Sequence, residues 1–126
     1  MKAKLTIKSQ GNGWQDCVVD NNADMTIDGS GVAIDYVING DKCSLLATPE
    51  LTMQTRTGSL NTTIKFVPSK QGFCKFSDGQ LQGEYKITVQ SYKFTYGEMG
   101  CSLVMTYLSG DDEEKINLRL NCLYER

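Results

Sequence analysis

Apolar and polar residues alternate along most of this chain. The alternation is clear over residues 3–7 and 32–38, and again over residues 101–107 and 116–124. A period of two residues is typical of a β-strand that turns one face to the core and the other to water. No window of a dozen residues has the 3.6-residue period of a helix. The pattern therefore predicts an all-β protein with about nine or ten short strands.

Turn-forming residues separate the alternating segments. Asn39–Gly40 is the strongest of these signals, because both central residues of a type I′ hairpin turn need positive φ angles. Gly11–Gly13 predicts a turn after the first strand, and Ser109–Asp112 predicts the turn of a C-terminal hairpin. Asn21–Asn22 is expected to end a short strand that begins at Trp14. This spacing of strands and turns predicts an antiparallel sandwich or barrel.

The segment from Glu84 to Tyr96 changes the face on which its apolar residues lie. Apolar residues occupy odd positions from 85 to 89 and even positions from 92 to 96, so the change falls near Gln90–Ser91. One extra residue in a strand has this effect, and such a β-bulge lets a long strand bend around a barrel corner. The sequence therefore predicts a bulge at this place.

Four pieces of the sequence occur in an order and at a spacing that a known family shares. They are Ile34–Tyr36, Leu51–Gly58, a strand that ends at Phe66 before a Pro/Lys/Gly loop, and Tyr107–Leu108. In these pieces the chain resembles the YwiB-like family of small bacterial β-barrel proteins, which look like relatives of the lipocalin and calycin barrels. The resemblance runs from Met25 to Leu123 and implies a lipocalin-like barrel, but no particular activity. Because 126 residues are the length of one domain, we expect a single antiparallel barrel over residues 1–126.

The chain contains no histidine, and this narrows its chemistry. Ser-His-Asp and Cys-His nucleophile systems and histidine-ligated zinc sites all need an imidazole. The five cysteines include no Cys-x-x-Cys pair, so they fit neither a zinc site nor, being odd in number, a disulfide framework. We expect buried thiols in a reducing compartment. The sequence thus indicates a protein that is not an enzyme and uses no metal or cofactor.

The charges are nearly balanced, with 13 Lys and Arg against 15 Asp and Glu and a net charge of −2. The basic residues are spread singly along the sequence, whereas nucleic-acid and anionic-membrane binding depend on clustered cations. We therefore expect no nucleic-acid or membrane partner. The first eight residues have no continuous apolar run of the kind that forms a signal peptide, which favours a cytoplasmic location. The acidic run Asp111–Glu114 is expected to be a solvated turn.

The interior of a β-barrel is either filled by side chains or open to one small ligand. Tyr36, Tyr85 and Tyr107 lie on the apolar faces of their strands, so they either line a cavity or fill it. Arg56 and Arg119 are candidates to bind an anionic group, because a guanidinium presents a rigid fork that fits carboxylate or phosphate. These five residues form the expected ligand-binding site. The sequence thus favours a non-catalytic module that holds a small amphipathic or anionic ligand in the barrel.

The alternative is a module that binds or assembles with proteins through its outer surface or an edge strand. Exposed edges accept further strands, so a homodimer stands beside a monomer as an expected state. Lys2, Lys4 and Lys8 on the first strand oppose such pairing, because charged side chains protect an edge. A contiguous apolar patch on the surface would favour this alternative.

Overall fold

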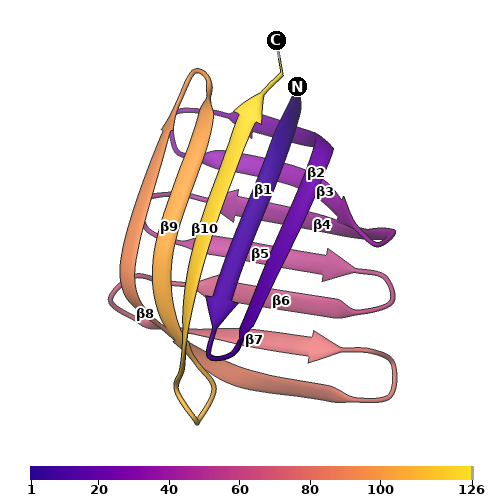
Figure 1. The fold of residues 1–126 in the computed structure, drawn as a ribbon, viewed down its shortest axis with the longest axis vertical. Helices are drawn as coiled ribbons and strands as arrows, with labels where there is room; N and C mark the ends of the chain where they lie inside the picture. The colour runs from indigo at the N-terminus through magenta and orange to yellow at the C-terminus, as the bar shows by residue number, and fades with distance from the viewer. Residues whose placement is uncertain (126) are drawn as a thin grey trace.

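The computed structural model describes residues 1–125, and these residues form ten β-strands (Figure 1). The strands are β1 (Lys2–Gly11), β2 (Trp14–Ile27), β3 (Val32–Ile38), β4 (Asp41–Ala47), β5 (Thr52–Thr57), β6 (Asn61–Phe66), β7 (Gln71–Ser77), β8 (Gln82–Gly97), β9 (Gly100–Ser109) and β10 (Glu114–Tyr124). All neighbours are antiparallel, and they close into one barrel in the order β1-β10-β9-β8-β7-β6-β5-β4-β3-β2. The predicted antiparallel all-β barrel is confirmed. The described residues contain no helix, and so none that could cross a membrane.

Each strand pairs with the next along the chain, and β1 pairs with both β2 and β10, which closes the barrel. Figure 1 shows two crossing layers, in which β1, β2, β9 and β10 run steeply and β3–β7 cross behind them. β8, with 16 residues, belongs to both layers, because it curves from the side of β7 to the side of β9. The turns β3–β4, β5–β6 and β7–β8 lie along one side of the barrel, at the right in Figure 1.

A β-bulge lies in β8 between its two halves. Val89 is opposite Tyr107 and Ser91 is opposite Thr106, so Gln90 is the extra residue. The bulge predicted from the change of apolar face is therefore confirmed at its predicted place. A bulge bends a strand and increases its twist, which is what β8 needs to pass from one layer to the other.

β2 is one strand of 14 residues, so the prediction that Asn21–Asn22 ends a short strand is wrong. The two asparagines lie opposite a single residue, Lys4, in a second irregularity of the register. The irregularity lies within the pairing of β2 with β1, which runs from Trp14 to Asp24, just before the last four residues of β2 pair with β3. Asn21–Asn22 therefore shifts the register of the strand without ending it.

The hairpin predicted at Asn39–Gly40 joins β3 to β4 and is confirmed. The φ angles of the two residues are 50° and 86°, as a type I′ turn requires. The turn pairs Ile38 with Asp41, so it fixes which side chains of β4 point inward. Every second residue of β4 is buried, beginning with Asp41.

Inward-pointing side chains fill the deep part of the barrel. The largest of those that are fully buried are Phe66, Leu5, Met25, Ile34, Ile87, Leu103, Met105 and Leu120. The ring of Phe66 meets the ring of Tyr107 edge to face, with 4.9 Å between centroids. Four of the five cysteines are buried free thiols, as predicted, whereas Cys17 on β2 is exposed. The deep interior is thus an apolar core and not a chamber.

Candidate functional site

One row of inward-pointing residues crosses six strands, next to the three turns on one side of the barrel. We call it the mouth row, and its members, each opposite the next on the neighbouring strand, are Tyr36, Cys43, Arg56, Thr62, Phe76 and Gly83. The row one step deeper consists of Ile34, Leu45, Gln54, Ile64, Cys74 and Tyr85. The two rows share one face of the sheet, because the side chains of a strand alternate between faces.

The interior becomes more polar and more accessible towards the mouth row. At one end of the row Tyr36 and Cys43 are buried, whereas Arg56, Thr62 and Phe76 further along are half-buried. The side chains deeper in the barrel are nearly all apolar. Apolar surface with a few well-placed polar groups is typical of small-molecule sites.

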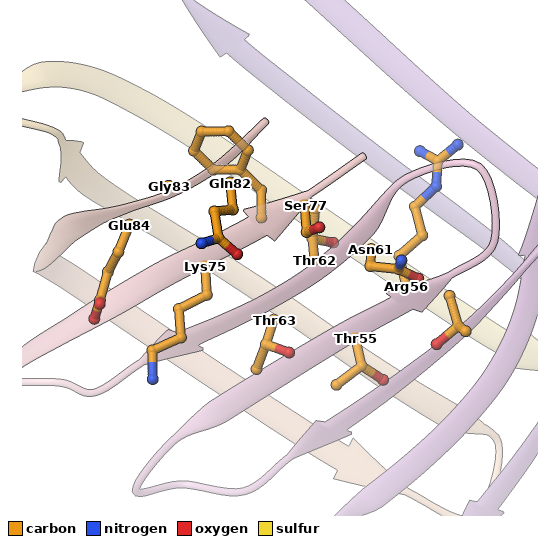
Figure 2. A pocket seen from close by; sticks show the side chains of 12 residues that line it. Thr55, Arg56, Asn61, Thr62, Thr63, Lys75, Ser77, Gln82, Gly83 and Glu84 are labelled. Carbon is orange, nitrogen blue, oxygen red and sulfur yellow. The ribbon is translucent and has the colours of Figure 1, made fainter. Parts of the chain in front are cut away.

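A hollow of about 870 Å³ lies at this end of strands β5–β8. The residues that line it are Thr55, Arg56, Thr57, Asn61, Thr62, Thr63, Lys75, Phe76, Ser77, Gln82, Gly83 and Glu84. They come from three consecutive cross-strand rows, of which the middle one belongs to the mouth row and the other two point outward. Figure 2 shows the guanidinium of Arg56 directed away from the side chains of Thr55 and Thr63. Eight of the twelve lining residues thus point outward, so the hollow lies over the outer face of β5–β8, and the Arg56 guanidinium points away from it.

Asp41 lies beside Arg56 and ties two turns together. Its carboxylate accepts hydrogen bonds from Arg56 Nε at 2.8 Å and from the backbone N and the Oγ of Ser59, both at 2.9 Å. The Ser59 backbone N–H and the Arg56 guanidinium lower the pKa of Asp41 from 3.8 to about 2, so the carboxyl is ionised at neutral pH. Gly58, with a φ of 151°, leaves room for this contact, because a Cβ there would overlap the Asp41 carboxylate. Asp41 thus joins the start of β4 to the β5–β6 turn.

Arg56 uses only part of its guanidinium in the ion pair. Nε bonds to Asp41, whereas Nη1 and Nη2 have no hydrogen-bond partner within residues 1–125, and the side chain is 22% exposed. Two parallel N–H groups of a guanidinium fit the two oxygens of a carboxylate or phosphate. Asp41 therefore fixes the direction of the Arg56 side chain and leaves its outer end available to an anion.

Tyr36 and Gln54 add a polar wall next to Arg56. Gln54 Nε2 donates a hydrogen bond to the Tyr36 hydroxyl oxygen at 2.5 Å. Burial raises the pKa of Tyr36 to about 12, so its phenol stays protonated and keeps a hydrogen to donate. The amide and the phenol are thus held in place as uncharged hydrogen-bonding groups.

The other two predicted tyrosines differ in their exposure. Tyr85 is 37% exposed, and its ring is 6.1 Å from that of Phe76 in the mouth row. Burial, with the Cys74 thiol as neighbour, raises the pKa of Tyr85 to about 12. Tyr107 is 9% exposed, and burial raises its pKa as well. Tyr85 therefore lines the accessible part of the interior, whereas Tyr107, packed against Phe66, fills the part below.

The titratable groups near the mouth row are held in unreactive states. Burial raises the pKa of the Cys43 and Cys74 thiols, so neither is a thiolate near neutral pH. Asp41 is ionised and occupied by its hydrogen bonds. Residues 1–125 contain no group of three or more side chains placed to hold a metal ion. The arrangement therefore offers hydrogen-bond donors and aromatic rings, and its acid and thiols are poor proton-transfer groups or nucleophiles.

Arg119 lies on the outer surface of the barrel. Its neighbours Leu118 and Leu120 on β10 point inward, and Arg119 itself is exposed. Contrary to the expectation of one site inside the barrel, Arg119 therefore does not point inward with the other four candidates. The structure brings three of the predicted site residues, Tyr36, Arg56 and Tyr85, to the mouth. Tyr107 lies in the packed interior, and Arg119 is on the outer surface, apart from the others.

Sequence reasoning missed three polar residues of this region, which are Asp41, Gln54 and Thr62. Asp41 did carry a signal, because it follows the Asn39–Gly40 turn and shares the apolar face of its strand with Cys43. A carboxylate on a buried face needs a charged or hydrogen-bonding partner. Gln54 carried no such signal, since its strand turns the polar face of Thr52 and Arg56 inward, and an uncharged Thr62 beside Ile64 and Phe66 does not by itself indicate a site.

The barrel has a partly open seam between β2 and β3. Only the last four residues of β2 pair with β3, and its first half pairs with β1 alone. Within the seam, Asp20 Oδ2 accepts a hydrogen bond from the backbone N of Val37 at 2.9 Å. Asp16 and Asp20 point towards the inside of the barrel, because the residues opposite them on β1 do so. Inward-pointing charges of this kind oppose the addition of another strand.

Comparison with known proteins agrees with this barrel. No family model and no curated protein matches the sequence. Among solved structures, the chain is similar to the crystal structure of the ywiB protein from Bacillus subtilis, with a TM-score of 0.82 and 14% sequence identity. The match covers 98% of this chain and 92% of that chain. The expected likeness to a YwiB-type barrel is therefore confirmed for the fold, and the relation to lipocalin and calycin barrels stays a prediction.

Proposed function

We propose that the protein is a non-catalytic binding module of the cytoplasm that takes the anionic end of a small amphipathic ligand at the mouth row. The observation that carries the proposal is the state of Arg56, whose orientation Asp41 fixes and whose outer nitrogens remain available. A fixed guanidinium binds an anion without first losing conformational freedom, which favours affinity.

The surroundings of Arg56 fit the remainder of such a ligand. The half-buried ring of Phe76 and the partly exposed ring of Tyr85 lie across the strands from it, and the hydroxyl of Thr62 is directly opposite. Because Phe66 and Tyr107 fill the space below, the apolar part of the ligand has to be short or lie along the rim. This differs from a lipocalin-like chamber, in which the ligand occupies the centre of the barrel.

The non-catalytic role and the cytoplasmic location are supported by the chemistry of the side chains. The thiols near the mouth are protonated and Asp41 is occupied by hydrogen bonds, so proton transfer and covalent catalysis are disfavoured there. All five cysteines are free, which suits a reducing compartment. These observations support a binding role in a reducing compartment.

The test compares two probes that differ in one group. Decanoate and decanol are each titrated into the full chain, and binding is followed by the NMR shifts of mouth-row amides. Native mass spectrometry of freshly purified protein shows whether a ligand is already bound. We expect decanoate to bind and decanol to bind at least tenfold more weakly, because only the carboxylate engages Arg56. Equal binding of the two probes, or shifts remote from the mouth row, would overturn the proposal.

Variants separate the loss of binding from the loss of folding. Arg56→Gln alone leaves the Asp41 carboxylate without its cation, so the double variant Asp41→Asn/Arg56→Gln, with two uncharged partners, is the better test. We expect it to fold and to lose the preference for decanoate. The double variant Asp35→Asn/Lys42→Gln removes one charge of each sign from the outer face of β3 and β4, and it serves as the matched control, which should bind as the parent does.

A further inference from the structure

The pairing of strands gathers cations that are far apart in the sequence. One row on the outer face of β2, β1, β10, β9 and β8 consists of Cys17, Lys8, Arg119, Val104 and Lys93, each opposite the next. Lys8 and Arg119 are direct neighbours across β1 and β10, although 111 positions, 119 minus 8, separate them in the chain. Three basic residues that are spread singly along the sequence therefore share one row on the surface, and two of them are adjacent.

The outward residues in the rows on either side of this one are uncharged. The row on one side consists of Gln15, Gln10, Asn117, Thr106 and Ser91, and the row on the other side consists of Val19, Thr6, Asn121, Ser102 and Thr95. Within residues 1–125, no carboxylate oxygen lies within 4.0 Å of a charged nitrogen of Lys8, Lys93 or Arg119. The acidic run at the β9–β10 turn is separated from Arg119 by at least two outward rows of the sheet. Its residue Glu114 is already bonded elsewhere, because it accepts a hydrogen bond from Trp14 Nε1 at 2.6 Å.

Two cations that face each other without a counter-ion cost stability. Like charges directly opposite on an antiparallel pair repel each other, and the sheet gives Lys8 and Arg119 no acid in compensation. Binding an anion between them would remove this repulsion. The arrangement is thus unfavourable for the barrel alone and favourable for a complex with an anion.

The same place on the surface is hollowed. A depression of about 770 Å³ lies over β1, β2, β9 and β10, and the outward side chains that line it include Lys8, Gln10, Cys17, Thr106, Asn117 and Arg119. Thr106 Oγ1 donates a hydrogen bond to Asn117 Oδ1 at 2.9 Å, so the amide nitrogen of Asn117 remains available as a donor. Asp16 also borders the depression, but it belongs to the opposite face of β2 from Cys17.

We propose that this depression binds the phosphate group of a small phosphorylated molecule between Lys8 and Arg119. The charge matches, because a phosphate monoester carries about two negative charges near neutral pH and the two side chains carry two positive ones. The guanidinium fork of Arg119 and the amide of Asn117 supply directed donors, and the ammonium of Lys8 supplies a point charge. A volume of about 770 Å³ is within the usual range for sites of small molecules. This site is separate from the mouth row and does not depend on the function proposed there.

The test uses phenyl phosphate as the probe and benzoate as its singly charged control. Each is titrated into the full chain at low ionic strength, and binding is followed by amide shifts on β1 and β10. Cys17, the one exposed cysteine in residues 1–125, provides a second measurement, because an occupied depression should slow its alkylation by neutral iodoacetamide. We expect phenyl phosphate to bind at least tenfold more tightly than benzoate, to protect Cys17, and to weaken as salt is added.

Paired variants complete the test. Lys8→Gln and Arg119→Gln should each weaken phenyl phosphate binding about tenfold, since each removes a charge-assisted contact. The single variant Lys42→Gln removes the same charge at an exposed position elsewhere and should bind as the parent does. An equal loss in that control, unchanged binding in the Lys8 and Arg119 variants, or equal affinity for benzoate would overturn the proposal. Binding of a short single-stranded oligonucleotide at least tenfold tighter than phenyl phosphate would overturn it too, because the occupant would then be a nucleic acid.

Discussion

Replacing Phe66 by alanine tests whether the deep part of the barrel is a packed core. The ring is 1% exposed and meets Tyr107 edge to face at 4.9 Å. A buried Phe→Ala substitution costs about 3–5 kcal/mol, of which an edge-to-face pair supplies about 0.5–1.5 kcal/mol. With an unfolding entropy of about 2.1 cal/mol/K per residue, a chain of 126 residues has roughly 0.26 kcal/mol/K in total. A loss of about 4 kcal/mol therefore lowers Tm by roughly 15 °C.

Thermal unfolding followed by circular dichroism measures this change, and guanidinium unfolding gives the free energy independently. Phe94→Ala is the matched control, because Phe94 is only half-buried and stacks on Tyr96 at 5.3 Å. We expect its effect on Tm to be less than half that of Phe66→Ala. A double-mutant cycle of Phe66→Ala with Tyr107→Leu isolates the contact between the two rings.

The reasoning fails if Phe66→Ala lowers Tm by no more than Phe94→Ala does. Such a result would mean that the space around Phe66 is already loose, so the interior would be a chamber able to hold a ligand deep in the barrel. The place of the proposed ligand would then move from the rim to the centre.

Three further predictions concern the turns and the outer face. The pKa of Asp41 is lowered to about 2 in the folded protein, so the stability it contributes is complete above about pH 4 and is lost as pH falls towards 2; Tm measured across this range should fall less steeply in Asp41→Asn than in the parent. Gly58→Ala should lower the free energy of unfolding in urea by about 1–3 kcal/mol, because the new Cβ overlaps the Asp41 carboxylate and the φ of 151° disfavours a side chain. An unchanged urea midpoint would show that the turn adapts freely. Lys8→Gln should raise the stability by about 0.2–1 kcal/mol, because it relieves the repulsion from Arg119; a lower Tm would indicate that Lys8 has a stabilising partner.

The local parts of the fold could be predicted from the sequence because each depends on neighbouring residues. The type I′ turn needs two residues that accept positive φ, and Asn39–Gly40 supplies them. The bulge at Gln90 follows from a change in parity that is visible within one strand. The prediction that Asn21–Asn22 ends a strand is wrong, because residues that break a strand also suit a bulge, and only the pairing with β1 decides between the two.

The sites depend on contacts between distant segments, and these were less predictable. Alternation shows that Arg56 and Arg119 occupy definite faces of their strands, but only packing shows which face is inside. In β5 the polar face, with Thr52 and Arg56, is the one that points inward. In β10 the apolar face points inward, so Arg119, on the other face, points outward. The contact between Lys8 and Arg119 was even harder to predict from the sequence, because the two residues become neighbours only when β1 and β10 close the barrel.

The position of β1 between β2 and β10 has a consequence for synthesis on the ribosome. Ala3 pairs with Tyr124, so the barrel cannot close until β10 has been made. At about 5–20 residues per second, β1 waits roughly 5–20 s for its second neighbour. During that time its edge and the apolar side chains of Leu5 and Ile7 are open to other nascent chains, and the lysines on its outer face are the charges that discourage such pairing. A messenger truncated before β10 would therefore yield chains with two permanent edges, which we expect to aggregate.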